Sequence, residues 1–178
     1  MIGLRSETAA LARLADRDLA RLWRLVADGA SAEVALRDIL PAIIEQYGAA
    51  GAVMAAEWYD QQREKVDAKG RFSAVPVAAT DRGAQALIGW ALDSATNDSS
   101  LRTLIGGGVQ RRIADHARYT ITGASVADRA SAGWKRIGDG STCAFCRLLI
   151  GRGAVYNEAT VSFESHDSCG CSAAPEWR

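Results

Sequence analysis

All four cysteines of the chain, and one of its two histidines, lie close to the end of the sequence. Cys143 and Cys146 form a Cys-x2-Cys pair, and after an insert the chain presents His166, Cys169 and Cys171. Thiolates and imidazole at short paired spacings are the ligands of a tetrahedral zinc ion. These five side chains are candidates for the four coordination positions of the ion. We expect Cys143 and Cys146 to bind zinc together with two or three of His166, Cys169 and Cys171.

A shell filled by protein side chains leaves no position for a water molecule, so the zinc is expected to be structural and not catalytic. Its binding free energy would become folding free energy for a tail that has few apolar residues. Two alternatives stay open. The cysteines could instead be buried or paired as disulfides, or Cys146 and His166 could act as the nucleophile and base of a thiol hydrolase or protease. The paired cysteine spacings argue against the enzyme, because a catalytic thiol is usually one cysteine.

The composition is that of an ordinary soluble globular protein. At 178 residues the chain predicts one domain, or one domain with a small satellite. The hydrophobic fraction is 48% and the formal net charge is zero, so nothing global argues for nucleic acid or a membrane surface. We expect no apolar run of membrane-spanning length and no signal peptide. The protein is thus expected in a reducing cytosol, where cysteine pairs more often bind metal than form disulfides.

Apolar residues at helical spacing predict a mainly α-helical body over residues 1–130. Pro41 lies inside the second helical stretch, which predicts a long helix that is kinked or broken near Leu40. Asn97 to Ser100 form a turn and capping cluster. The expected helices are 6–28 with Ser6 as its cap, 31–69, 80–94 with Thr80 as its cap, and 101–122, with a further turn at 128–134.

Three arginines of the last long helix, Arg111, Arg112 and Arg118, could form a basic patch for DNA or an acidic protein. Asp115 lies four residues after Arg111 and three before Arg118. Local ion pairing is therefore the preferred interpretation.

The same helix carries His116 and the triplet Gly106 to Gly108. A lone helical histidine is expected to be half-exposed and without a role. The glycines lack the Gly-Lys-Ser/Thr ending of a phosphate-binding loop. Since glycine inside a helix costs stability, we expect a break or a close helix crossing there.

The composition of the chain changes after Arg136. Glycines and cysteines become frequent there, and the apolar runs are short, such as 148–150 and 154–156. They predict a small β-containing tail. The expected architecture is a helical body, 1–130, followed by a small α+β, zinc-stapled Cys/His module, 131–178.

The tail also carries a set of motifs that match a known family. They are Gly-Trp-Lys-Arg-Ile at 133–137, Cys-Ala-Phe-Cys at 143–146, Arg-Gly-Ala-Val-Tyr at 152–156, His-Asp-Ser-Cys-Gly-Cys at 166–171 and Pro-Glu-Trp at 175–177. Gln-Tyr-Gly at 46–48, Trp-Tyr-Asp at 58–60, Arg63 and Gln-Arg-Arg at 110–112 accompany them upstream. From about residue 30 to its end, the chain resembles the Mu F-like minor head proteins of tailed bacteriophages, in the version found in phages and prophages of actinobacteria. Ser165 and Gly170 depart from the pattern, which has an aromatic and a charged residue there; neither is a candidate ligand.

The resemblance implies a structural protein of the phage head, present in few copies inside the head or next to the portal. Its expected partners are the portal, the major capsid protein or both, with a weak contact to packaged DNA. No membrane, small-molecule substrate or enzymatic activity is expected. The protein is expected in the host cytoplasm during assembly and then in the virion. A zinc-dependent nucleic-acid-binding module is the alternative, but it needs a basic face that the nearly neutral tail does not offer.

Overall fold

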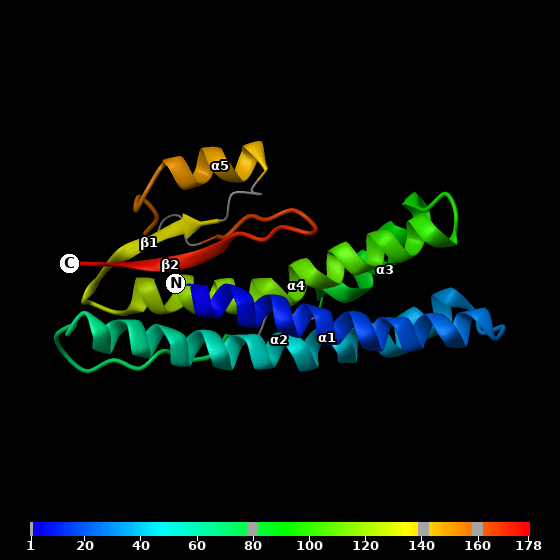
Figure 1. Ribbon diagram of the computed structural model, residues 1–178, viewed down its shortest axis with the longest axis horizontal. Coiled ribbons are helices and arrows are strands. Elements are labelled where there is room, and N and C mark those ends of the chain that lie inside the picture. Colours follow the sequence, from blue (N-terminus) through cyan, green and yellow to red (C-terminus); the bar gives the residue numbers. More distant parts are fainter. Residues whose placement is uncertain (1, 78–81, 139–142, 158–161) are drawn as a thin grey trace.

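The computed structural model describes residues 2–77, 82–138, 143–157 and 162–178. Its elements are α1 (Ile2–Ala27), α2 (Ala32–Lys65), α3 (Arg82–Ser94), α4 (Asp98–Ala127), β1 (Ser131–Ile137), α5 (Ala144–Gly151) and β2 (Ser172–Trp177). Helices α1, α2 and α4 lie alongside one another, and α3 contacts α2 and α4 at one end of this bundle (Figure 1). The β1–β2 sheet lies on α4 at the other end, with α5 beyond it (Figure 1). The predicted fold class, mainly α with a small α+β part at the C-terminus, is confirmed.

The first two helices differ from the expectation at their ends and in the middle. Helix α1 begins at Ile2, so Ser6 is inside it and donates a 2.8 Å hydrogen bond to the Gly3 carbonyl instead of capping. Gly29, with a φ of +102°, follows the last turn of α1. Helix α2 continues through Pro41, so the predicted break is wrong, while the kink stays a prediction. Buried Leu36, Leu40 and Ile44 on both sides of the proline pack into one cluster and offset the missing hydrogen bond.

Helix α2 is long and apolar enough to cross a membrane, judged by length and composition alone, with a mean hydropathy of 1.3 in its most apolar window. This corrects the expectation that no apolar run reaches that length. The core helix of a bundle passes the same test, and α2 packs against α1, α3 and α4. Its buried positions include Leu40, Ile43, Ala55 and Tyr59.

Helix α4 begins where the sequence predicted a cap. The Asn97 side chain accepts a hydrogen bond from the Ser100 amide, and the Ser100 hydroxyl accepts one from the Asn97 amide. The helix runs unbroken through the glycine triplet, and two of the three glycines, Gly107 and Gly108, lie at close contacts with other elements. A side chain at Gly108 would clash with Leu87 of α3, and one at Gly107 would press on Ser168 of the tail. The predicted crossing is confirmed and the predicted break is wrong. The expected cap of α3, Thr80, lies outside the described residues.

In the described residues of the tail there is one helix and one sheet, in places that local patterns did not indicate. Residues 131–137, expected as a helical turn in part, form β1, which pairs with β2 in antiparallel register, Trp134 opposite Pro175. Residues 148–150, expected as extended, belong to α5. Gly133, at φ +125°, lies against the Tyr156 carbonyl, where Trp134 and Tyr156 form an isolated bridge.

Buried apolar side chains form two clusters. One joins α1, α2, α3 and α4, with Leu22, Leu40 and Ile105 among its members. The other joins the helical body to the tail, from Tyr59 and Ile121 to Trp134, Phe163 and Ala173, and it includes three of the cysteines. The division at residue 130 stays a prediction, but the two parts share a core.

Candidate metal centre

The first two cysteines are placed by the start of α5. Cys143 is the residue that caps the helix, and its sulfur accepts a 3.4 Å hydrogen bond from the amide of Cys146 one turn later. Both sulfurs thereby face the same side of the helix start. Cys143 is exposed and Cys146 is fully buried. The Cys-x2-Cys spacing thus forms the knuckle that the sequence predicted.

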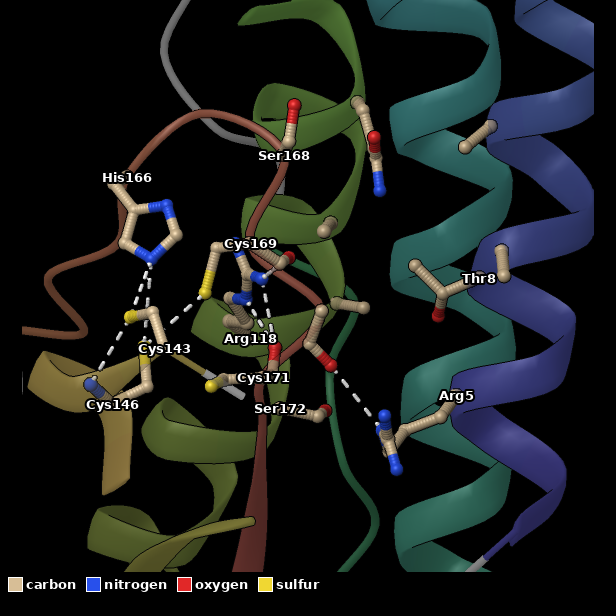
Figure 2. Close-up of a pocket in the computed structure, with 16 residues that line it drawn as sticks. Arg5, Thr8, Arg118, Cys143, Cys146, His166, Ser168, Cys169, Cys171 and Ser172 are labelled. Carbon is tan, nitrogen blue, oxygen red and sulfur yellow. Dashed lines mark hydrogen bonds between the residues drawn. The ribbon is translucent and has the colours of Figure 1, made fainter. Parts of the chain in front are cut away.

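The other three candidates come from the loop that precedes β2, and they meet the knuckle over α4 (Figure 2). His166 Nε2 lies 3.0 Å from Cys143 Sγ and 3.8 Å from Cys146 Sγ. Cys169 Sγ lies 3.6 Å from Cys146 Sγ. Two groups of three donors result, one of Cys143, Cys146 and His166 and one of Cys146, Cys169 and Cys171, each with its atoms within 4.8 Å of one another. All five predicted residues are therefore brought together, with Cys146 common to both groups.

His166 has the orientation of a metal ligand. Its Nδ1 is 2.8 Å from the Asp167 carbonyl oxygen, to which a protonated Nδ1 donates. This contact leaves Nε2 as the nitrogen with a free lone pair, directed at the two knuckle sulfurs (Figure 2). Ligating histidines commonly have their second nitrogen fixed in this way.

The types of donor are those of a zinc site, and their separations can be compared with those of a tetrahedral one. Ligands at about 2.3 Å for sulfur and about 2.0 Å for nitrogen, in a tetrahedron, lie about 3.8 Å apart for two sulfurs and about 3.5 Å apart for sulfur and nitrogen. The observed separations of 3.6 Å between Cys146 and Cys169 and 3.8 Å between Cys146 and His166 agree with these values, and the 3.0 Å of Cys143 and His166 is somewhat shorter. Thiolates with imidazole suit zinc better than calcium or magnesium, which prefer oxygen.

The surroundings of the four cysteines shift the pKa values of their thiols in different directions. The amide of Cys146, followed by the contact with His166, lowers the pKa of Cys143 to about 7. A hydrogen bond from Cys171 lowers the pKa of Cys169 to about 4, while the pKa of Cys171 is raised, chiefly because its thiol is the donor to Cys169 and then because of burial. Burial is the main cause that raises the pKa of Cys146. Cys169 is therefore the better anion of the second pair, and Cys171 the better proton donor.

The loop that carries His166, Cys169 and Cys171 is called the cysteine loop below. Its backbone is held by Arg118, which lies in α4 and is 1% exposed. Its guanidinium donates to the Cys169 carbonyl at 2.6 Å and to the Cys171 carbonyl at 2.7 Å. The same group pairs with Asp115 at 2.7 Å and donates to Ser165 Oγ at 3.1 Å. The loop is thus fastened to the helix that forms the floor of the site.

The local ion pairs that the sequence predicted are present. Asp115 lies 2.7 Å from Arg118 and 3.6 Å from Arg111, so these two arginines form no free basic patch, and Arg112 donates to the carbonyls of Gly83 and Gly108. The role of Arg118 in the loop was not predicted, because its carbonyl partners lie some fifty positions away in sequence.

The expectation that His116 is half-exposed is wrong. The side chain is 3% exposed and contacts Gly48 of α2, where a side chain would overlap the imidazole ring. Burial lowers its pKa. His116 is therefore a packing residue that fills the space left by Gly48. The sequence signal for this contact was the glycine inside α2 and not the histidine itself.

A cavity of about 390 Å³ adjoins the cysteines and is bordered by α1, α4 and the cysteine loop. Arg5 of α1 reaches across it and donates to the Gly170 carbonyl at 3.3 Å (Figure 2). The candidate metal centre is therefore bordered by elements from the beginning, middle and end of the chain.

A comparison with known proteins adds the family. The profile of one family, described as VG15 protein, matches residues 1–178. No curated protein and no solved structure matches the chain. Because the matched region spans the sequence, the chain belongs to the VG15 protein family, a family of phage proteins.

Proposed function

We propose that this protein is a structural component of the head of a tailed phage, a minor head protein of the Mu F-like kind that acts next to the portal. Its membership in a phage family and the tail motifs at 133–137, 143–146 and 166–171 support this role. Its partners would be the portal, the major capsid protein or both. It would work by docking and not by catalysis, inside the head after assembly in the host cytoplasm.

The observation that carries the proposed zinc site is the convergence of five cysteine and histidine donors over α4. We assign a structural zinc ion to Cys143, Cys146, His166 and Cys169, since contacts of 3.0, 3.6 and 3.8 Å link these four residues. Cys171 then stays outside the shell as a thiol that donates to Cys169. With four protein ligands the ion supplies stability and no reaction.

The metal would join two segments of the tail. Cys143 caps α5 and Cys146 lies in its first turn, whereas His166 and Cys169 belong to the loop held by Arg118 on α4. Zinc would therefore hold α5 against the loop that Arg118 fixes on α4, and the free energy of metal binding would add to the free energy of folding.

The zinc assignment is tested by elemental analysis of protein purified under reducing conditions. One zinc per chain is expected in the wild type and in Cys171→Ser, and loss of zinc is expected in Cys169→Ser and Cys146→Ser. Cys171→Ser is the matched control, because it removes a buried cysteine of the same loop. Absence of zinc in the wild type, with the thiols oxidised in pairs, would overturn the metal site; loss in Cys171→Ser but not in Cys169→Ser would reverse the assignment.

The role in the head is tested in the particle. We expect the protein in purified phage heads, in few copies, and cross-linked to the portal. A density map of the assembled head in which this chain touches neither portal nor capsid protein, or heads of normal composition and infectivity without it, would refute the role.

One contact favours a second candidate, a thiol enzyme. His166 Nε2 is 3.0 Å from Cys143 Sγ, and the pKa of Cys143 is lowered to about 7, as expected for a nucleophile beside a base. The pair involves Cys143 and not Cys146, which the sequence had suggested. Rapid, stoichiometric alkylation of Cys143 in zinc-loaded protein would favour the enzyme, because a ligated thiolate is protected.

A further inference from the structure

A second buried arginine lies beside the cysteines. Arg136, in β1, is 3% exposed, and its guanidinium carbon is 3.8 Å from the centroid of the Phe163 ring. One terminal nitrogen donates to the Glu164 carbonyl at 2.6 Å. The other lies 4.0 Å from Cys146 Sγ, at the outer limit of an N–H···S contact. The side chain thus lies between an aromatic face and the cysteine common to both donor groups.

The charge of Arg136 has no carboxylate partner in the described part of the chain. No Asp or Glu there lies within 4.0 Å of its guanidinium, whereas Arg118 has Asp115 at 2.7 Å. The Nε of Arg136 is buried and has no hydrogen-bond partner among the described residues. A buried cation without a counter-charge is costly, since it loses its hydration without an ionic partner. Cys146 Sγ is the group in contact with Arg136 that can carry a negative charge.

The proposed zinc shell supplies that charge. Three thiolates and one neutral imidazole around a divalent ion leave the centre with a net charge of one negative unit. One guanidinium balances it. Cys146 is 0% exposed, so water does not screen the charge of its thiolate and a nearby cation must do so.

We propose that Arg136 is a positioning residue of the metal centre, which contacts the Cys146 thiolate from outside the shell and balances the charge of a three-cysteine, one-histidine zinc site. This inference rests on the proposed zinc site. Phe163 holds the guanidinium from one face, and the Glu164 carbonyl fixes its plane. Groups outside the shell that contact ligands commonly change metal affinity by about 10- to 100-fold when they are removed.

The test compares Arg136→Met, Arg136→Lys and the control Arg63→Met. Arg63 is also a largely buried arginine, with its side chain 12% exposed, but it pairs with Asp128 of the α4 end and donates to Lys69 and Gly70. Zinc affinity is measured on full-length reduced protein by competition with a chromophoric chelator. Cobalt(II) replaces zinc in a parallel titration, which reports the sulfur-to-metal charge-transfer band.

We expect about a 10- to 100-fold weaker zinc affinity in Arg136→Met and a smaller loss in Arg136→Lys, which keeps the charge but not the planar group. The cobalt charge-transfer band should move to longer wavelength in Arg136→Met, because a thiolate without a nearby cation is the better electron donor. Arg63→Met should lower the stability of the protein while leaving both the affinity and the band unchanged.

The results distinguish a failure of the proposed metal site from a failure of the role given to Arg136. Wild-type protein that binds neither zinc nor cobalt overturns the proposed metal site and this inference with it. Tight wild-type binding with equal affinity and an identical band in Arg136→Met overturns the inference alone. If Arg136→Met does not fold, Arg136→Lys decides: wild-type affinity together with an unshifted band refutes the contact, and a measurable loss with a shifted band supports it.

Discussion

Replacing Arg118 with methionine should destabilise the protein by about 4 kcal/mol, because one buried side chain holds the cysteine loop on α4. Its removal leaves the carbonyls of Cys169 and Cys171 without their donors, and each buried group that loses its partner costs about 1–3 kcal/mol. Asp115 loses its closest cation but keeps Ser165 at 3.0 Å and Arg111 at 3.6 Å, so its share falls below the roughly 3–5 kcal/mol of a fully broken buried pair.

Urea denaturation followed by circular dichroism, with and without zinc, measures this loss. The matched control is Arg21→Met, since Arg21 pairs with Asp18 at the same 2.7 Å distance but its side chain is 72% exposed. That exposed pair should contribute less than about 1 kcal/mol. The double variant Asp115→Asn, Arg118→Met should recover part of the loss, because no carboxylate is then left buried. A loss below about 1 kcal/mol in Arg118→Met, equal to that of the control, would refute the role of Arg118 as the anchor of the loop.

Three further changes test other parts of the fold. Gly133→Ala should cost more than about 2 kcal/mol by chemical denaturation, because φ is +125° and the new methyl meets the Tyr156 carbonyl, whereas Gly151→Ala, with nothing within 4 Å, should be neutral or slightly stabilising; equal effects would contradict the packing of β1. Asn97→Ala should lower stability by about 1 kcal/mol through loss of the cap of α4, and an unchanged urea midpoint would count against it. Because burial lowers the pKa of His116, the unfolded chain binds this proton more readily, so stability should fall as pH drops below about 6.5 towards the folded pKa; His116→Gln should show a smaller acid loss, and an identical pH profile would disprove the assignment.

Short-range patterns in the sequence predicted what depends on neighbours along one helix. The cap at Asn97, the Asp115 pairs with Arg111 and Arg118, and the Cys143–Cys146 knuckle all join residues within four positions of each other. Spacing alone decides whether such residues face one another, so these predictions needed no tertiary information.

The errors share a different cause. Residues 131–137 adopt a strand because residues 172–177 pair with them, and the burial of Arg118 and His116 comes from the tail and from α2. Local propensity contains no information on such partners. The contact of Arg136 with Cys146 could not be predicted from the sequence either, because it depends on how β1, α5 and Phe163 pack together.

The placement of the cysteines determines which parts of the chain the proposed zinc ion would stabilise. A metal module joined to a body by a flexible linker would gain stability from zinc without affecting the helices. Here Cys146, Cys169 and Cys171 belong to the same buried cluster as Leu4 of α1 and Tyr59 of α2. Zinc that binds only the folded state must then stabilise the helical bundle and the tail together, by RT ln(1 + [Zn]/Kd). Because α1 also reaches the loop through Arg5 and Gly170, loss of the metal should loosen the first helix as well as the last strand.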